Sequence, residues 1–434
     1  MRVPALGRFG HRFALILSGE LTQSLFHFIL NIVLVRELPA HAYGLFAIVF
    51  TVGAVGVTYI RALVAVPATL FLSPSLGRPA ERGYDVAFGS GACCVAVAMA
   101  VCACAALSPV IGLGALAAGA FVGLYAFRSY LRIVLLARRG ARIAGLSDLV
   151  YALAGLGLTI FLHGDAGAVL DHALLGIAGA HALGIAVVFA AIGQPVRLSF
   201  RPSMRRRYRA IGRTLLWSLA GVTGTIVQGQ GLTLLLAILA GPEAYAPVAA
   251  TLVLFAPLRI PTSALANMVL PEITGLLAQG RVRAARGLVL RSTGLIGLAC
   301  LAYGLVMWTA LPIIEQHLFK GRFLHEPMTW IGVGVWSVVT VSLLYAIPRA
   351  FLEASAAFRV IASGATVSAG IGFLIMVPLL MTLEPAFALI GLAASECATA
   401  LWSAKAFHDR ARHPDGRASA LDRAALARDV PAQA

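Results

Sequence analysis

Charged residues are scarce in this chain of 434 residues: they make up 12% of it, whereas hydrophobic residues make up 60%. Soluble globular domains carry roughly 25% charged and 45–50% apolar residues. A soluble protein of this composition would have too little polar surface to cover itself. The shortage of charge therefore excludes an ordinary soluble protein and indicates a chain whose solvent is the lipid bilayer.

Sequence features of enzymes and metal proteins are also missing. The six cysteines lie in apolar segments without C-x-x-C spacing, so we interpret them as small buried hydrophobic residues. The chain has no Walker A loop, no H-E-x-x-H sequence and no serine-containing nucleophile elbow. We therefore expect a non-enzyme with no catalytic residues, no metal site and no cofactor. A primary ATP-driven pump made of this chain alone is not expected either.

Long apolar segments of helical length fill most of the chain. A spanning helix needs roughly 20 apolar residues, and only helices or closed barrels satisfy every backbone group in hydrocarbon. The alternation of barrel strands is absent, so we predict an all-α integral membrane protein with about twelve transmembrane helices. The expected helices lie near 13–35, 43–71, 87–107, 112–136, 145–163, 172–192, 214–240, 245–270, 287–311, 328–351, 360–381 and 386–407.

Basic residues fall almost entirely on one side of this arrangement. With the amino terminus inside, 26 of the 34 Lys and Arg residues lie on the cytoplasmic side, and only Arg36, Lys320 and Arg322 lie outside. A miscounted helix would move every later loop to the other side and destroy this asymmetry. We therefore expect both termini in the cytoplasm.

The net charge of +16 is densest between Arg197 and Arg213. Because spans flank this stretch, we interpret it as a cytoplasmic linker that contacts anionic lipid headgroups, and we expect no nucleic-acid partner. The predicted organisation is an N-lobe (1–192), a basic linker (193–213), a C-lobe (214–407) and a polar cytoplasmic tail (408–434).

The two lobes echo each other in sequence. The segment LPAHAYGLFA, which begins at Leu38, is similar to AGPEAYAPVA, which begins at Ala240. Each half begins with an outward helix, so the pattern predicts a parallel repeat of six plus six helices about an axis along the membrane normal. Transporters built in this way hold their substrate between the halves and open to each side in turn.

Five arginines lie within the predicted spans, where a charge at the helix centre costs roughly 2.5–3.5 kcal/mol. They are Arg61, Arg128, Arg132, Arg259 and Arg349. They come from expected helices 2, 4, 8 and 10, which are symmetric positions of the two lobes, and they would line a cationic cavity. Because arginine stays charged and binds phosphate with two parallel hydrogen bonds, the predicted ligand is an anion. For Arg132 and Arg349 the alternative is a place at the cytoplasmic interface or an ion pair with an acid such as Glu353.

Arg259 is the deepest of these arginines, 14 residues into its expected helix, which is roughly 20 Å along the axis. Pro257 and Pro261 flank it. They should interrupt the helix, because proline lacks a backbone N–H and clashes with the preceding turn.

Other polar residues of the spans form a second group of candidates. Gln23, His27 and Asn31 share one face of helix 1 with Glu20, and Gln228 lies in helix 7. They are candidates for binding sugar hydroxyls, with hydrogen bonding between helices as the alternative.

Three acids lie within the spans or near their ends: Glu20, Asp148 and Glu396. Each could carry a coupling proton or neutralise a nearby arginine, and we favour neutralisation.

The segment from Gln23 to Tyr43, followed by GLFA, resembles the opening of polysaccharide-unit flippases, where helix 1 ends in a short turn with Leu-Pro or Gly-Pro, a polar residue and Tyr-Gly. AGPEAY at Ala240 is similar to its counterpart at helix 7. Over about 13–407 the chain thus resembles Wzx-type flippases of the multidrug/oligosaccharidyl-lipid/polysaccharide (MOP) exporter superfamily.

This resemblance implies a MATE-like fold in the bacterial inner membrane. It also implies alternating access for an undecaprenyl-pyrophosphate-linked oligosaccharide, and it makes a polysaccharide polymerase a candidate partner. A cationic central cavity is part of the family picture, and that role is carried first to Arg61, Arg128 and Arg259.

Two other functions stay open. An ion-coupled multidrug exporter of the same superfamily would favour an acidic cavity, and the excess of arginine within the spans argues against it. A membrane polysaccharide polymerase or ligase usually has a large periplasmic loop, whereas the longest outside loop expected here is 312–327.

Overall fold

The computed structural model describes residues 4–65, 67–68, 78–138, 140–159, 166–192, 198–199, 201–202, 208, 216, 219–355 and 357–412. Most of the expected linker 193–213 and the tail from residue 413 onward lie outside the described residues. The chain divides into two compact units, unit 1 (Met1–Leu219) and unit 2 (Ala220–Ala434).

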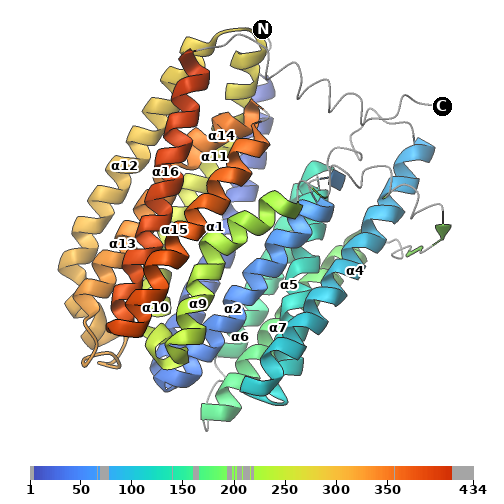
Figure 1. The fold of residues 1–434 in the computed structure, drawn as a ribbon. Coiled ribbons are helices and arrows are strands. Elements are labelled where there is room, and N and C mark those ends of the chain that lie inside the picture. The colour runs from blue at the N-terminus through green and yellow to red at the C-terminus, as the bar shows by residue number, and fades with distance from the viewer. Residues whose placement is uncertain are drawn as a thin grey trace. The chain divides into compact units, whose positions relative to one another are not determined.

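Unit 1 is a bundle of long helices (Figure 1). Its elements are α1 (Pro4–Glu37), α2 (Ala40–Ile60), the π-helix η1 (Arg61–Ala65), α4 (Arg78–Ile111), α5 (Gly114–Ala137), α6 (Ala141–Thr159) and α7 (Ala166–Ile192). Helix α5 is central, because it packs against α2, α4 and α7, while α1 packs against α6.

Unit 2 repeats the same style of packing with more interruptions in its helices. Its elements are η2 (Val227–Gly231), α9 (Leu232–Leu239), α10 (Gly241–Leu254), α11 (Ala256–Ala278), α12 (Val282–Ile313), η3 (Ile314–Leu318), α13 (Met328–Leu344), α14 (Ala346–Ala354), α15 (Phe358–Thr382), η4 (Pro385–Phe387) and α16 (Ala388–Arg412). Helix α16 packs against α13 and α15, and α11 packs against α12 and α14.

Eleven helical segments among the described residues are long and apolar enough to span a membrane. A twelfth span is obtained if α10 and α11, which meet at an angle of 46°, are counted as one broken span. The described residues form no strand. The predicted all-α membrane fold with about twelve spans is therefore confirmed.

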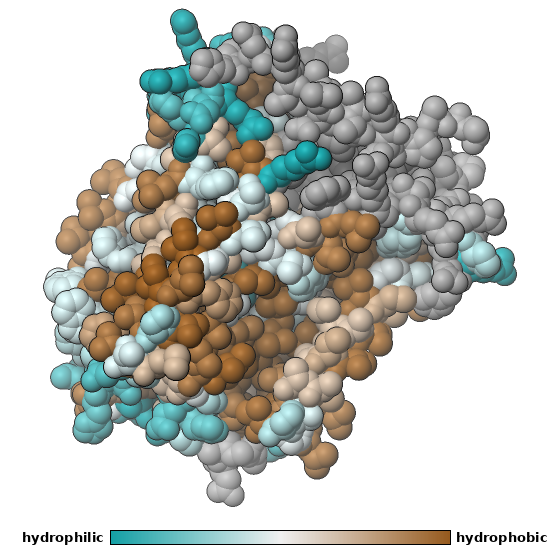
Figure 2. Space-filling model, in the orientation of Figure 1, coloured by the Kyte–Doolittle hydropathy of each residue, from teal (hydrophilic) through white to brown (hydrophobic). Residues whose placement is uncertain are grey.

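Large apolar side chains cover the outside of the helices. Leu113 is 87% exposed, Leu374 77% and Met381 80%. In Figure 2 such residues form broad apolar bands on the visible face, with polar residues gathered toward the ends of the helices. A soluble protein rarely exposes so much contiguous apolar surface, so lipid is the natural solvent of these faces.

Two glycines let α4 and α5 approach each other closely. A Cβ atom added to Gly119 would lie 2.6 Å from the carbonyl oxygen of Ala100, and one added to Gly123 would lie 2.9 Å from that of Ala96. The two glycines are four residues apart and therefore share a helix face. Small residues at this spacing are what membrane helices use for close contact, because hydrophobic burial gives no advantage within lipid.

The echoed segments occupy matching places at the starts of helices α2 and α10. Tyr43 lies in the first turn of α2 and Tyr245 in the first turns of α10, and both side chains are buried. The sequence similarity between Leu38 and Ala240 therefore corresponds to two tyrosines packed in equivalent local positions, one in each unit.

Candidate functional site

Three charged side chains of α5 and α6 form the centre of unit 1. The Arg128 Nη2 atom lies 2.5 Å from Asp148 Oδ1, and Arg132 Nε lies 3.0 Å from Asp148 Oδ2. The arginines are four residues apart on α5, so they present their guanidinium groups to the same side. The Arg128 and Asp148 side chains are 4% and 3% exposed, so their contact is a buried ion pair.

Helix α1 brings two further polar groups to this centre. Glu20 Oε1 accepts a hydrogen bond from Arg132 Nη1 at 2.8 Å, and Gln23 Oε1 lies 3.4 Å from Arg128 Nη1. The four ionic groups, Arg128, Arg132, Asp148 and Glu20, carry formal charges that sum to zero. The neutralisation that we favoured for Glu20 and Asp148 is thus seen in their contacts.

A stack of aromatic and imidazole rings lies beside Arg128. The guanidinium carbon is 4.1 Å from the centre of the Tyr151 ring, a cation–π distance. His181 stacks on Tyr151 with ring centres 4.3 Å apart and on Tyr125 with centres 4.8 Å apart. The Tyr151 hydroxyl lies 2.6 Å from His27 Nε2. One face of the Arg128 guanidinium is thereby covered by the Tyr151 ring.

His181, Tyr151 and Tyr125 were not predicted as site residues. His181 is fully buried on α7, and neither of its ring nitrogens has a hydrogen-bond partner among the described residues. The sequence could have pointed to His181, because it lies in the middle of an otherwise apolar span and a histidine there is rarely retained without a polar neighbour.

The remaining residue of the helix 1 stripe, Asn31, links α1 to α2. Its amide oxygen accepts a hydrogen bond from the Tyr43 hydroxyl at 3.1 Å, and its nitrogen donates to the His27 carbonyl at 2.8 Å. Asn31 is buried. The stripe of polar residues on α1 is therefore buried at Asn31 and becomes exposed toward Glu20.

A cavity of about 190 Å³ adjoins the charged centre. Its lining consists of Glu20, Gln23, Val57, Tyr125, Arg128, Ser129 and Arg132. The volume is several times the roughly 30 Å³ that one water molecule takes up in the liquid. Four of the predicted site residues thus line one cavity.

Arg61 is not among the residues that line this cavity. It opens the π-helix η1, which continues α2, and it is exposed. Among the described residues no acid lies within ion-pair distance of its guanidinium. A π-helical turn shifts the register of the side chains that follow it and is frequent at functional positions.

In unit 2 the helix that carries Arg259 is broken, as the flanking prolines predict. Pro257 has no N–H, and the Leu258 N–H binds the Phe255 carbonyl at 3.2 Å instead of the Leu254 carbonyl. The Leu254 oxygen accepts a hydrogen bond from the Tyr303 hydroxyl of α12 at 2.6 Å. The backbone group freed at the break is thus satisfied by a neighbouring helix.

Arg259 itself is exposed and has no ion-pair partner among the described residues. It is the only charged residue between Glu243 and Glu272. The nearer of these two acids is 13 residues away, roughly 20 Å along a helix. An isolated charge in so long an apolar stretch must lie against a wet pathway or another polar surface.

A buried acid lies near Arg259. Glu396 on α16 is 6% exposed, has Tyr345 and Gln228 beside it, and lies within the electrostatic range of Arg259. One of its oxygens, Oε2, and the Gln228 amide nitrogen have no hydrogen-bond partner among the described residues. This is the second place where the structure brings predicted site residues together.

Arg349 is held on the edge of the same region. Its Nε atom lies 3.2 Å from Glu353 Oε1, one turn along α14, and its Nη2 atom lies 3.4 Å from Thr225 Oγ1. The ion pair with Glu353, which was the alternative given for this arginine, is therefore present.

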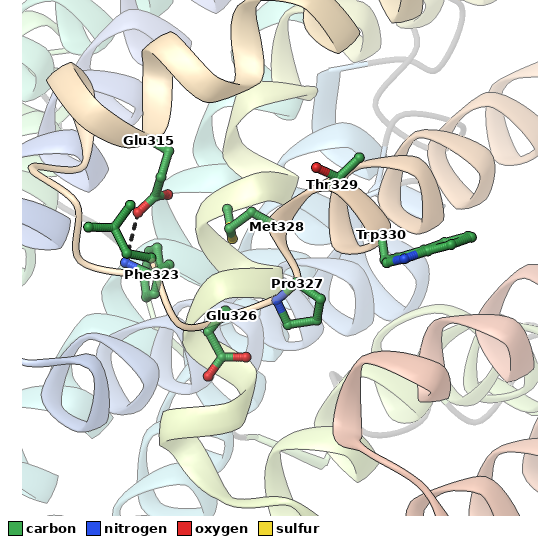
Figure 3. Close-up of a pocket in the computed structure, with 8 residues that line it drawn as sticks. Glu315, Phe323, Glu326, Pro327, Met328, Thr329 and Trp330 are labelled. Carbon is green, nitrogen blue, oxygen red and sulfur yellow. Dashed lines mark hydrogen bonds between the residues drawn. The ribbon is translucent and has the colours of Figure 1, made fainter.

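A larger cavity, about 350 Å³, lies at the loop after η3 (Figure 3). Glu315 Oε1 accepts the backbone N–H of Phe323 at 2.8 Å, while Glu326 and Trp330 line the opposite part of the cavity. Among the described residues no set of three metal-ligand side chains gathers here or elsewhere. The hydrogen bond ties the loop to η3, which is a structural role.

No protein-family model matches the chain, and no curated protein matches it in sequence. Among solved structures, it is similar to an inward-facing multidrug resistance MATE family transporter of the MOP superfamily, with a TM-score of 0.67 and 12% identity over 91% of this chain and 96% of that one. An outward-facing transporter of that kind gives a TM-score of 0.55 and 13% identity over 92% and 94% of the two chains.

A third similar structure is a MOP superfamily transporter from Pyrococcus furiosus, described by the reverse polarity of its binding pocket, which suggests a different function. Its TM-score is 0.54, with 13% identity over 92% of this chain and 94% of that one. The chain therefore has the MATE-like fold that the sequence resemblance implied.

Proposed function

We propose that this protein is a transporter that flips an undecaprenyl-pyrophosphate-linked oligosaccharide across the bacterial inner membrane by alternating access. The MATE-like fold supports a membrane transporter, and the arginines within the spans support an anionic substrate. The glycan would feed exopolysaccharide, O-antigen or capsule export, with a polysaccharide polymerase as a candidate partner. Both termini would lie in the cytoplasm, and the two lobes would be joined by the basic linker.

The exposure of Arg259 within an apolar stretch is the main observation behind this proposal. It is exposed, lacks an ion-pair partner among the described residues, and lies in an apolar stretch too long for its side chain to reach a membrane surface. A guanidinium in that position requires a polar environment, and an anionic group is the strongest partner available to it. Arg61, which is exposed and has no acid within ion-pair distance among the described residues, is the corresponding candidate for anion binding in unit 1.

The other candidates take supporting roles in this proposal. Arg128, Arg132 and Arg349 are paired with acids, so they contribute hydrogen-bond donors rather than net positive charge. Gln23, His27, Asn31 and Gln228 would contact sugar hydroxyls only where a conformational change opens their helices. Glu396, which is buried without an ion pair within 4.0 Å among the described residues, is the best placed acid for a coupling proton.

The multidrug exporter remains a second candidate, because two of the similar structures are multidrug resistance transporters and because Asp148 and Glu396 are buried acids. The two candidates differ in the charge of their substrate. An anionic glycolipid requires Arg259, whereas a cationic drug would be bound more tightly after Arg259 is neutralised.

The test is translocation of a pyrophosphate-linked glycolipid in proteoliposomes by the wild type, Arg61→Gln and Arg259→Gln at matched protein levels. Arg142→Gln and Arg283→Gln, which remove exposed arginines at the starts of α6 and α12, are the matched controls. We expect at least tenfold slower transport for Arg259→Gln and near-normal rates for the controls. Equal transport by all variants would remove the arginines from the site. Drug efflux without glycolipid transport would establish the second candidate.

A further inference from the structure

The two acids that pair with the arginines of unit 1 differ in their burial and in the number of their ion pairs. The Asp148 side chain is 3% exposed and contacts both Arg128 and Arg132. The Glu20 side chain is 49% exposed, and among the described residues its only ion-pair partner is Arg132, through Nη1. An exposed ion pair contributes little free energy, whereas breaking a buried one is strongly unfavourable. Of the two acids, Glu20 is therefore the one whose side chain can separate from its arginine.

A suitable space adjoins the weaker contact. Glu20 and Arg132 both line the cavity of about 190 Å³, together with the donors of Gln23, Arg128 and Ser129. Arg132 uses Nε for Asp148 and Nη1 for Glu20, and its Nη2 forms no hydrogen bond among the described residues. If Glu20 swings away, the outer edge of the guanidinium presents two parallel donors, which is the geometry that binds a phosphate group.

The charge of this centre depends on where Glu20 is. With Glu20 in contact, the formal charges of Arg128, Arg132, Asp148 and Glu20 sum to zero, and without it they sum to +1. An arriving phosphate group therefore finds a net positive site only when it takes the place of the carboxylate. When the phosphate group leaves, the carboxylate is available to return.

We propose that Glu20 is a displaceable counter-ion: the pyrophosphate of the transported lipid takes its place on Arg132, and Glu20 returns to Arg132 when the substrate leaves. This rests on the proposed function, since it assigns the phosphate to the transported lipid. Asp148 stays in place during the exchange and keeps Arg132 oriented through Nε. Glu20 is a positioning and specificity residue, because it excludes ligands that cannot compete with a carboxylate.

The test measures binding of inorganic pyrophosphate to the purified full chain in a detergent with an uncharged headgroup, by isothermal titration calorimetry. Glu20→Gln should bind about tenfold more tightly than the wild type, which corresponds to about 1.4 kcal/mol. Arg132→Gln should lose binding, and the double variant should show no gain from Glu20→Gln. Asp171→Asn removes an exposed carboxylate elsewhere in unit 1 and should bind like the wild type.

Several results would overturn the inference. One is that Glu20→Gln and the wild type bind pyrophosphate with equal affinity, and another is that Asp171→Asn gains as much affinity as Glu20→Gln. The others are that Glu20→Gln still raises the affinity when Arg132 is also replaced, and that no variant binds pyrophosphate. Nanodiscs with and without phosphatidylglycerol identify the source of the phosphate. If that lipid abolishes pyrophosphate binding, the bilayer is the occupant and the substrate assignment is wrong.

Glycolipid translocation by the wild type separates this inference from the proposed function. Transport together with an unchanged affinity of Glu20→Gln would keep the proposed function and refute the displacement. Tighter pyrophosphate binding by Glu20→Gln without glycolipid transport would keep the exchange on Arg132 and refute the glycolipid as its ligand.

Discussion

Replacing Asp148 by Asn is the sharpest test of the charged centre in unit 1. Asparagine keeps the shape of the side chain but removes the charge that Arg128 Nη2 and Arg132 Nε contact at 2.5 and 3.0 Å. Arg128, 4% exposed, loses its acid, while Arg132 keeps Glu20. Removing one partner of a buried pair costs about 3–5 kcal/mol. Glu20→Gln breaks a half-exposed pair and should cost roughly 0–1 kcal/mol.

The expected difference in unfolding free energy between these two variants is therefore at least about 2 kcal/mol. It can be measured by titrating the detergent-solubilised chain with sodium dodecyl sulfate and following helix content by circular dichroism. If the units unfold separately, the transition of unit 1 is the one that should shift. Asp171→Asn controls for the loss of a negative charge elsewhere in that unit.

A double variant sharpens the test. Removing both partners, as in Arg128→Met with Asp148→Asn, leaves no uncompensated charge, so it should be more stable than Asp148→Asn alone. The reasoning is refuted if Asp148→Asn lies within about 1 kcal/mol of the wild type, or if the double variant is no better than the single one.

Three further predictions follow from close contacts elsewhere. In Gly184→Ala the new Cβ would lie 2.8 Å from Arg128 Nε, so the same titration should show a loss of about 1–3 kcal/mol. In Tyr303→Phe the Leu254 carbonyl loses its donor, and the transition of unit 2 should lose about 1–3 kcal/mol. In Glu315→Ala the loop 319–327 loses its hydrogen bond to η3, and limited proteolysis there should be about tenfold faster. An unchanged value in any of the three would contradict the contact from which it is drawn.

Hydropathy, charge asymmetry and helical spacing predict much of this molecule from sequence. The spans are recognisable because each is a long apolar run, and the break before Arg259 because Pro257 lacks an N–H. The four-residue spacing of Arg128 and Arg132 correctly places both on one face, and in the structure both reach the same carboxylate, Asp148.

The partners of these arginines could not be predicted in the same way. Helical periodicity predicts which residues share a face of one helix. It does not predict which face of another helix packs against that face. Asp148 follows Arg132 by 16 residues, and Glu20 precedes it by 112. Their convergence depends on how α1, α5 and α6 pack. The sequence indicated that Glu20 and Asp148 neutralise nearby arginines but not which ones. The cationic cavity stays a prediction that now depends mainly on Arg61 and Arg259.

The hydrogen bond from Tyr303 to the Leu254 carbonyl has a mechanical consequence. A break caused by proline alone leaves an unsatisfied oxygen and a soft joint, because nothing fixes the angle between the two helical segments. Here the Leu254 oxygen accepts a hydrogen bond from the Tyr303 hydroxyl of α12. The angle between α10 and α11 is therefore fixed by a contact with a third helix. Within unit 2, this hydrogen bond therefore limits the movement of the helical segment that carries Arg259. If that segment changes its angle to α10, either α12 moves with it or the hydrogen bond from Tyr303 breaks.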